Sequence, residues 1–371
     1  MINKQLNTTK NLSLENVTIL LINDANFNSG VGTNVRLFEN ALSSIFKIER
    51  LDIKFFDLNA PKPSYAVNKI YTNNININRM ISVLDKIRLK PKAQQIIIFG
   101  DAALINFVKN DPDILFFHHP NFLEHPKNYS LMVKLAVKIT IKKIEKIKNN
   151  ALIITLSNYS KNLLSKHTHV AEDRIKVVYP YVDLPKPSQE ILENIKKKYN
   201  PLSLPLILAV GTSIPLKNFL TLYKAVEDTN MLVLRVGGDE KIERSIYKIP
   251  ENVKFAGHGN LSLDELSALY SISDVLALTS VDEGFGRPLI EAMYFSLPIV
   301  SNKCTTSPEI VGDSGILISD PYDYNQLRLG LYETLKNQEF YRKKVSERSK
   351  LFSKEKYIER MTYIIKNIIK P

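Results

Sequence analysis

The sequence predicts an α/β protein made of two doubly wound domains, each a parallel sheet covered by helices. Three observations lead to this prediction. Short, nearly continuous runs of Ile, Leu and Val recur along the chain, as in strands that are buried on both faces. Helical stretches separate these runs. The alternation pauses once, at the proline-rich segment Tyr179–Pro187, which we interpret as a linker between domains.

The expected strands fall into one block before this linker and one block after it. In the first block they are Val17–Ile22, Ile96–Gly100, Ile114–Phe117, Ala151–Leu156 and Ile175–Tyr179. In the second block they are Leu206–Gly211, Met231–Val236, Val253–Ala256, Val275–Thr279, Pro298–Ser301 and Gly315–Ile318. We therefore expect an N-terminal domain over residues 1–185, a C-terminal domain over residues 186–340, and a basic, helical end over residues 341–371.

Length and composition favour a cytoplasmic protein. The 371 residues suffice for two domains with separate cores, and a hydrophobic content of 44% is typical of soluble globular proteins. No apolar run approaches the roughly 20 residues that span a bilayer, and the first ten residues lack the apolar core of a signal peptide. Cys304 is the single cysteine, which excludes an intrachain disulfide and a cysteine metal cluster.

The net charge of +12 is concentrated in two segments. Residues 127–148 hold seven lysines and one glutamate, and residues 341–371 hold ten Lys or Arg and three Glu. The first segment is a predicted amphipathic helix with lysines at Lys134, Lys138, Lys142 and Lys146 beside an apolar face of Leu131, Leu135 and Ile139. Such a helix can lie on an anionic membrane surface. A solvated helix face beside the core is the alternative, and nucleic acid is a further candidate partner.

The most informative segment is 280–293, which follows the expected strand Val275–Thr279. Two glutamates, Glu283 and Glu291, flank a glycine turn and the start of an expected helix at Pro288. The turn consists of Gly284, Phe285, Gly286 and Arg287. Glycines let the backbone approach a ligand, and a helix N-terminus attracts anions. Because carboxylates accept hydrogen bonds from hydroxyls, the predicted ligand is a phosphate that carries sugars.

The segments from Gly257 to Leu317 resemble the C-terminal half of the family 4 retaining glycosyltransferases, within glycosyltransferase group 1 and of the GT-B type. They include a helix with the capping-box residues Ser262 and Glu265. The resemblance is strong over residues 200–320 and looser over residues 1–185. It implies two Rossmann-like domains facing a central cleft, with a C-terminal helix that crosses back to the first domain. It also implies transfer, with retention, of a hexose-like sugar from a GDP- or UDP-linked donor to a glycan or lipid-linked acceptor.

The same resemblance assigns roles around the donor. Lys217, which follows an expected strand and Gly211, matches the lysine that binds the diphosphate, and a surface lysine is the alternative. Glu283 corresponds to the residue that binds hydroxyls of the donor sugar, with the Gly284–Arg287 amides on the phosphates. Glu291 corresponds to the residue that binds the ribose. A cation on the departing diphosphate is the main catalytic contribution in such a reaction.

One departure from the family concerns the diphosphate. Thr212 stands where many members have an arginine, so one expected cation is missing. Arg287 either supplies the missing charge or points to solvent. Glu309 is a further family feature, but helix capping explains it equally well.

In the first domain, the resemblance places a loop with Gly30 and Gly32 at the cleft. It also places a histidine near the transferred sugar, and the spacing to Pro120 favours His118 over His119. A structural histidine is the alternative. No Asp-x-Asp pair indicates a required metal, so neither a metal nor a cofactor is expected.

Two other functional classes remain open. One is a GT-B hydrolase or epimerase that acts on a nucleotide sugar without an acceptor. The other is a basic, non-catalytic protein that binds a membrane or nucleic acid. The presence of Lys217, Glu283 and Glu291 together argues against the non-catalytic class.

Overall fold

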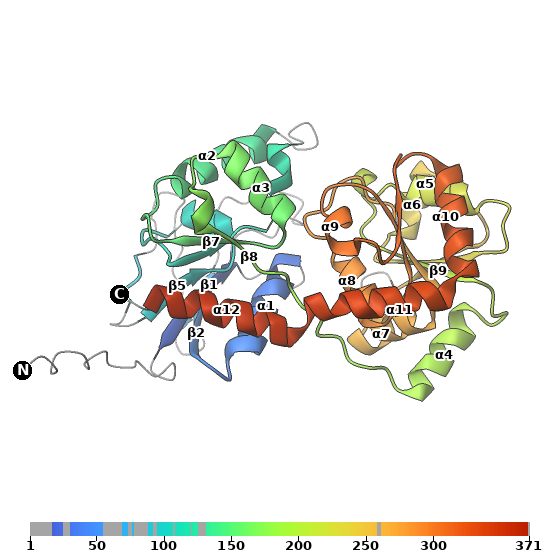
Figure 1. Ribbon diagram of the computed structural model, residues 1–371, viewed down its shortest axis with the longest axis horizontal. Coiled ribbons are helices and arrows are strands. Elements are labelled where there is room, and N and C mark those ends of the chain that lie inside the picture. Colours follow the sequence, from blue (N-terminus) through green and yellow to red (C-terminus); the bar gives the residue numbers. More distant parts are fainter. Residues whose placement is uncertain are drawn as a thin grey trace, which may run out of the picture.

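The structure, a computed structural model, describes residues 17–24, 30–54, 69–72, 76–77, 88–91, 95–106, 108–118, 120–124, 131–257 and 261–369. Two α/β domains are joined by the extended segment 178–188, which contains no helix or strand (Figure 1). Each domain has its own sheet with helices on both faces. The predicted fold class of two doubly wound domains is therefore confirmed.

The N-terminal sheet has the strand order β4-β3-β2-β1-β5-β6-β7-β8. The strands are β1 (Thr18–Asp24), β2 (Lys47–Lys54), β3 (Lys69–Thr72), β4 (Asn76–Ile77), β5 (Gln95–Phe99), β6 (Ile114–Phe116), β7 (Leu152–Thr155) and β8 (Ile175–Val177). The pairs from β2 through β1 to β8 are parallel, whereas β3 and β4 add to the β2 edge in antiparallel pairing. The sequence analysis did not predict β2, β3 and β4, since β2 mixes charged with apolar residues and β3 and β4 are very short.

Alternating residues of these strands pack on opposite helices. Ile96 and Ile98 face a layer formed by α1 (Gly30–Leu42) and the C-terminal helix α12 (Lys354–Ile369). Ile97 and Phe99 face the other layer. The remaining helical segments of the N-terminal domain are η2 (Ala102–Asn106), η3 (Pro120–Leu123), α2 (Leu131–Ile144), α3 (Asn158–His167) and η5 (Glu172–Arg174). Side chains buried on both faces explain the continuous apolar runs in the sequence.

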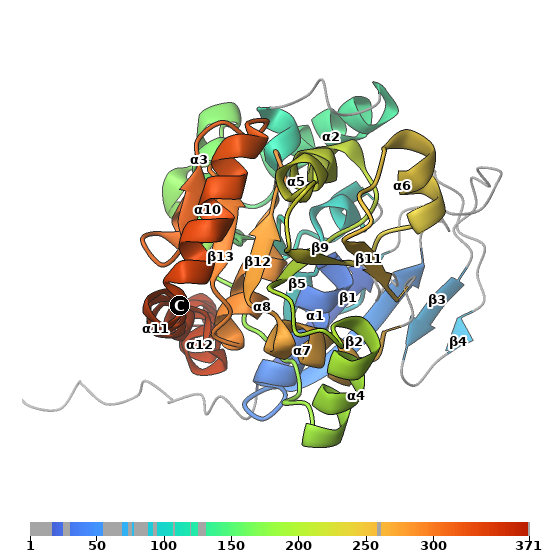
Figure 2. The same ribbon diagram turned by 90° about the vertical axis from the view of Figure 1, so that its right-hand side faces the viewer.

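The C-terminal sheet is parallel throughout its described pairs, in the order β11-β10-β9-β12-β13-β14. Figure 2 shows this domain toward the viewer, with β11, β9, β12 and β13 labelled. Its strands are β9 (Leu206–Val210), β10 (Leu232–Val236), β11 (Val253–Ala256), β12 (Val275–Leu278), β13 (Ile299–Asn302) and β14 (Ile316–Ile318). Its helical segments are α4 (Gln189–Tyr199), η6 (Pro215–Lys217), α5 (Phe219–Val226), α6 (Glu240–Ile246), α7 (Leu263–Ile272), α8 (Arg287–Tyr294), α9 (Ser307–Val311), α10 (Tyr324–Lys336) and α11 (Gln338–Ser349). The predicted capping box of Ser262 and Glu265 is present at the start of α7.

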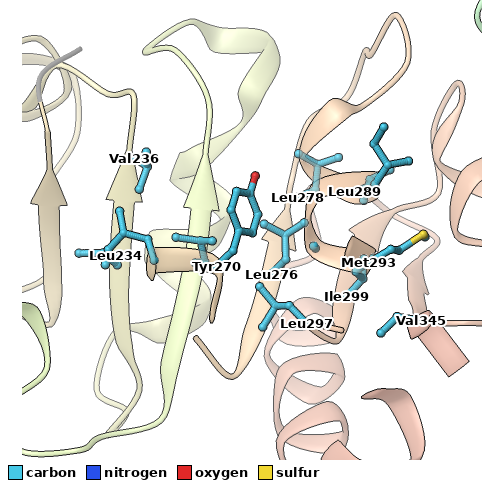
Figure 3. Close-up of a cluster of buried hydrophobic side chains, with 14 of the residues drawn as sticks. Leu234, Val236, Tyr270, Leu276, Leu278, Leu289, Met293, Leu297, Ile299 and Val345 are labelled. Carbon is cyan, nitrogen blue, oxygen red and sulfur yellow. The ribbon is translucent and has the colours of Figure 1, made fainter. Parts of the chain in front are cut away.

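The core of this domain joins α7, α8 and α11 to one face of the sheet. Figure 3 shows Tyr270 of α7, Met293 of α8 and Val345 of α11 around Leu276 of β12. Each of these four side chains is fully buried. Helix α8, which lies within the segment 280–293, is thus fixed against the sheet by core packing.

After α11 the chain leaves the C-terminal domain. A short turn, η7 (Lys350–Phe352), leads into α12, which lies along the N-terminal domain beside α1 (Figure 1). Tyr357, Met361 and Ile365 of α12 are buried there with residues of α1 and β1. Among the described residues, none of the helices combines the length and the apolar character needed to cross a membrane.

Candidate functional site

The glycine turn after β12 leads directly into α8. Gly286 has φ 84° and precedes the first helical residue, Arg287. This positive φ favours glycine, and a Cβ at Gly286 would also lie only 3.0 Å from Leu289 Cδ1. Pro288 occupies the first turn, where its missing N–H is not needed. The turn therefore presents a helix N-terminus, which suits an anion.

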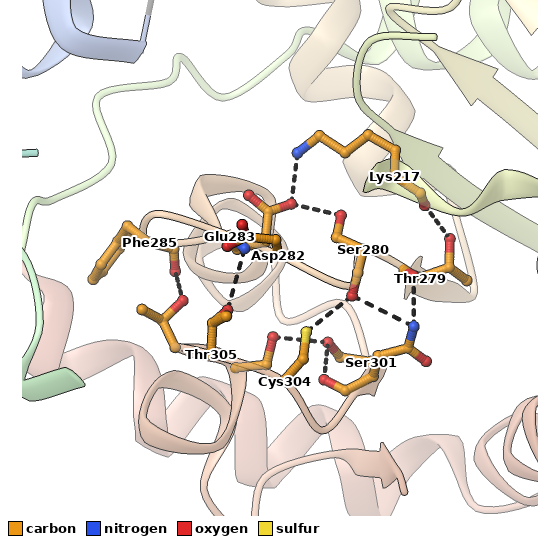
Figure 4. Close-up of polar contacts among 12 residues, drawn as sticks. Lys217, Thr279, Ser280, Asp282, Glu283, Phe285, Ser301, Cys304 and Thr305 are labelled. Atoms are coloured by element: carbon orange, nitrogen blue, oxygen red, sulfur yellow. Dashed lines mark hydrogen bonds and ion pairs between the residues drawn. The ribbon is translucent and has the colours of Figure 1, made fainter. Parts of the chain in front are cut away.

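Lys217 and Glu283 form an ion pair beside this turn (Figure 4). Lys217 Nζ lies 2.6 Å from Glu283 Oε1, and the Ser280 hydroxyl donates to the same oxygen at 2.6 Å. The two side chains are only 18% and 10% exposed, so little water screens the pair. Thr279 Oγ1 donates to the Lys217 carbonyl at 2.8 Å and fixes the backbone of η6 to the end of β12. A diphosphate that binds Lys217 must compete with Glu283 for it.

Glu291 lies on α8 and is held from two sides. The Tyr270 hydroxyl donates to Glu291 Oε2 at 2.7 Å, and Arg287 Nε lies 3.5 Å from Oε1. Burial, reinforced by the charge of Glu291, raises the pKa of Tyr270 well above its usual value, so Tyr270 remains a hydrogen-bond donor. Sequence reasoning missed Tyr270, because its place on α7 suggested only core packing.

Arg287 also reaches across the interface between the domains. Its Nη1 donates to Asn34 Oδ1 at 3.2 Å, and Asn34 Nδ2 lies 3.3 Å from His118 Nδ1. The Arg287 side chain is 20% exposed. Of the two alternatives for Arg287, the one that points it to solvent is therefore wrong. Asn34 lies on α1, two positions after Gly32, and the sequence analysis did not single it out.

His118 follows β6 and is buried, with both ring nitrogens engaged. Nε2 lies 2.7 Å from the Gly100 carbonyl, and since a carbonyl only accepts, Nε2 carries the hydrogen. Nδ1 is then unprotonated and accepts from Asn34. Burial lowers the pKa of His118 to about 4, although the bond to Gly100 opposes this shift. His118 is thus a neutral imidazole with a fixed tautomer.

Asn121 in η3 contacts the motif from the N-terminal domain. Its Nδ2 donates to the Glu283 carbonyl at 2.7 Å and to Asp282 Oδ1 at 2.5 Å. Asn121 and Asp282 are 2% and 8% exposed. The backbone that carries Glu283 is therefore tied to both domains. No local sequence pattern identifies Asn121 as a site residue, since its partners are more than 160 positions away.

Glu309 caps a helix of the other domain. Its carboxylate accepts the backbone N–H groups of Asn158 at 2.7 Å and of Tyr159 at 2.9 Å, in the first turn of α3. The Tyr179 hydroxyl donates to Glu309 Oε1 at 2.7 Å. Helix capping, the alternative offered for Glu309, is thus what the structure shows, but the helix is α3 rather than its own α9. This carboxylate joins the two domains.

The other predicted site residues differ in how exposed they are and in which element they lie. Gly30 and Gly32 are in the first turn of α1, and Thr212 is exposed in the turn between β9 and η6. The Phe285 side chain is 3% exposed and packs beside Tyr179 and Phe352, so only its backbone can serve a ligand. His119 and residues 25–29 lie outside the described residues.

The structure brings most of the predicted site residues together at the domain interface. Direct contacts link Lys217 with Glu283, Arg287 with Glu291, and Arg287 through Asn34 with His118. Over the part of the chain that the structure describes, no group of three or more His, Cys, Asp or Glu side chains is placed to hold a metal ion. Positive groups that the structure describes at this interface include Lys217, Arg287 and the N-terminus of α8.

The sequence predicted a glycosyltransferase from this motif, and comparison with known families agrees. The family model described as Glycosyl transferases group 1 matches residues 191–352, most of the C-terminal domain. The predicted resemblance to this group is confirmed, whereas the assignment to family 4 stays a prediction.

Two related proteins are both O-antigen chain mannosyltransferases. Mannosyltransferase B from Escherichia coli is 27% identical over 61% of this chain, and RfbU from Salmonella typhimurium is 27% identical over 57%. The chain spans 60% and 56% of the length of these two relatives.

Solved structures show the same fold over almost the whole chain. Sucrose-phosphate synthase from Thermosynechococcus elongatus has a TM-score of 0.70 and 17% identity over 95% of this chain and 99% of its own. Anabaena HepE, solved in complex with UDP and glucose, has a TM-score of 0.65 and 15% identity over 95% and 100%. The protein therefore has the GT-B fold.

Proposed function

We propose that the protein is a retaining glycosyltransferase that moves a hexose-like sugar from a nucleoside diphosphate donor to a glycan or lipid-linked acceptor. The observation that carries this proposal is the Lys217–Glu283 pair beside the N-terminus of α8, inside the domain that matches the family. The mannosyltransferase relatives support a sugar donor and a glycan acceptor. The HepE complex with UDP and glucose supports a nucleotide site in this fold.

In this proposal Lys217 binds the diphosphate and neutralises the charge that develops as it leaves. Glu283, released from Lys217, accepts hydrogen bonds from hydroxyls of the donor sugar. Glu291 accepts those of the ribose, and Tyr270 and Arg287 hold its carboxylate in place beforehand. Because His118 is neutral and both its nitrogens are engaged, its role is to orient Asn34 rather than to take a proton.

The proposal requires neither a metal nor another cofactor, because Lys217, Arg287 and the α8 N-terminus supply positive charge. The test is a donor screen with GDP-, UDP- and ADP-linked hexoses, with and without EDTA. We expect one donor class to be bound and slowly hydrolysed without acceptor, equally in EDTA. Loss of that activity in EDTA would contradict the metal-free mechanism, and binding of none of the donors would contradict the proposed function.

An anionic membrane surface is the proposed second partner, and helix α2 carries this proposal. Leu135 and Ile139 are 56% and 44% exposed, although the opposite face of α2 is buried through Ile141 and Ile144. The exposed Lys138 and Lys142 lie beside these apolar side chains on the helix surface. Apolar contact together with basic charge suits a bilayer better than a nucleic-acid backbone.

Vesicle sedimentation tests this second partner. We expect the protein to bind vesicles that contain anionic lipid, and a variant with Lys134, Lys138 and Lys142 replaced by Glu to stay in solution. The matched control changes three lysines of the C-terminal domain to Glu, namely Lys196, Lys197 and Lys241. If both variants lose vesicle binding equally, the binding depends on the overall charge of the protein and not on helix α2. Tight nucleic-acid binding at physiological salt without vesicle binding would support the non-catalytic alternative.

A further inference from the structure

A buried ion pair contacts the chain on both sides of Lys217. Arg235 on β10 is 0% exposed, and its Nη2 lies 2.8 Å from Glu243 Oε1 on α6, which is itself buried. Removing two charges from water is costly, and a buried pair is a weak source of stability compared with apolar packing. Its contacts with the neighbouring turn and helix therefore indicate its role better than its contribution to stability does.

On one side the pair holds the turn before Lys217. The Ser213 hydroxyl donates to Glu243 Oε1 at 2.6 Å. The Gly211 N–H donates to the Val236 carbonyl at 2.9 Å, and Arg235 Nη1 donates to that same carbonyl at 2.6 Å. The turn 211–213 is thus attached at both ends. Gly211 bonds to the Val236 carbonyl that Arg235 also contacts, and Ser213 bonds to Glu243 itself.

On the other side the pair holds the helix after Lys217. The Arg235 guanidinium carbon lies 3.4 Å from the centroid of the Phe219 ring, in the first turn of α5. The Tyr223 hydroxyl, one turn further along α5, donates to Glu243 Oε2. The segment between these two attachments contains Lys217.

Two glycines show how closely the backbone fits the pair. A Cβ at Gly238 would lie 2.6 Å from Glu243 Oε1 and 2.9 Å from Arg235 Cζ. Gly237 has φ 76°, and a Cβ there would lie 3.1 Å from the Gly211 carbonyl oxygen. The ion pair and the turn 211–213 account for these two adjacent glycines after β10.

We propose that Arg235 and Glu243 are positioning residues, which fix the turn 211–213 and the start of α5 and thereby set where Lys217 meets the diphosphate. This inference rests on the function proposed above. Ser213 is the link between the turn and the pair. It has no charge, so its removal leaves Arg235 and Glu243 paired and separates positioning from stability.

The test compares Ser213→Ala with Ser213→Thr, which keeps the hydroxyl, and with Ser245→Ala. Ser245 is an exposed serine on α6 whose hydroxyl donates to the Ile242 carbonyl, so it is a matched control. Calorimetry measures the affinity for UDP and GDP, and thermal unfolding measures the fold. We expect Ser213→Ala to weaken nucleoside diphosphate binding about tenfold and to change the Tm by less than about 2 °C. Ser213→Thr should restore affinity, and Ser245→Ala should leave it unchanged.

Glu243→Gln provides the second variant, because it removes the charge that Ser213 contacts. If Ser213 acts through Glu243, the affinity loss of the double variant should be no larger than that of the stronger single variant. Additive losses, or wild-type affinity in Ser213→Ala, would overturn the inference while leaving the proposed function intact. Wild-type protein that binds no nucleoside diphosphate would contradict the proposed function itself, and the inference with it.

Discussion

Glu309 offers a direct test of how the two domains are joined. Its carboxylate accepts two backbone N–H groups of α3, the Asn158 side chain and the Tyr179 hydroxyl. Loss of a helix cap costs about 1 kcal/mol. A part-buried hydrogen bond to a charged group adds about 1.5 kcal/mol, whereas the exposed contacts add little. Glu309→Ala should therefore destabilise the protein by about 2.5 kcal/mol.

Thermal unfolding measures this effect. If the 371 residues are treated as one cooperative unit, about 2.5 kcal/mol corresponds to a decrease in Tm of about 3 °C. Glu309→Gln keeps an acceptor oxygen but not the charge, so about half that decrease is expected. Glu347→Ala, an exposed glutamate on α11, is the control and should leave the Tm unchanged. A Glu309→Ala variant as stable as the control would refute the cross-domain cap.

Two further predictions concern His118 and Arg287. The folded pKa of His118 is about 4, below its unfolded value of 6.5, so the unfolded chain binds more protons between these two pH values. The free energy of unfolding therefore decreases as the pH falls through this window, by up to about 3 kcal/mol. Tm measured at pH 7.5 and 5 should show this decrease, and His118→Gln should reduce it; an equal decrease would contradict the assignment. Arg287→Leu should weaken nucleoside diphosphate binding in calorimetry, and Thr212→Arg should restore part of it; unchanged affinity in Arg287→Leu would exclude Arg287 from the diphosphate.

The sequence predicted the elements whose pattern is local. Strands buried on both faces leave continuous apolar runs, so the strands near Ile96, Leu206 and Val275 were found within one or two residues. The start of α8 was also predictable, because Gly286 and Pro288 have conformational requirements that depend on few neighbours. The edge strands β3 and β4 lack such a pattern and were missed.

Contacts between distant parts of the chain were not predictable in the same way. Asn121 meets Glu283 and Asp282, and Glu309 meets α3, only because the linker places the domains face to face. Nothing within ten residues of Asn121 distinguishes it from an ordinary turn asparagine. The position of Arg287 was left open for the same reason, since its partner Asn34 is 253 residues away.

Lys217, as the cation that meets the diphosphate, is the residue on which the proposed function depends most. Turnover of Lys217→Ala, measured at saturating concentration of the donor identified in the screen, tests this directly. Lys224→Ala, an exposed lysine on α5, is the control, and thermal unfolding verifies the fold of both variants. A transition-state charge contact is worth about 3 kcal/mol, so we predict that Lys217→Ala loses about a hundredfold or more in turnover while Lys224→Ala keeps it. Near-normal turnover in folded Lys217→Ala would contradict the central claim.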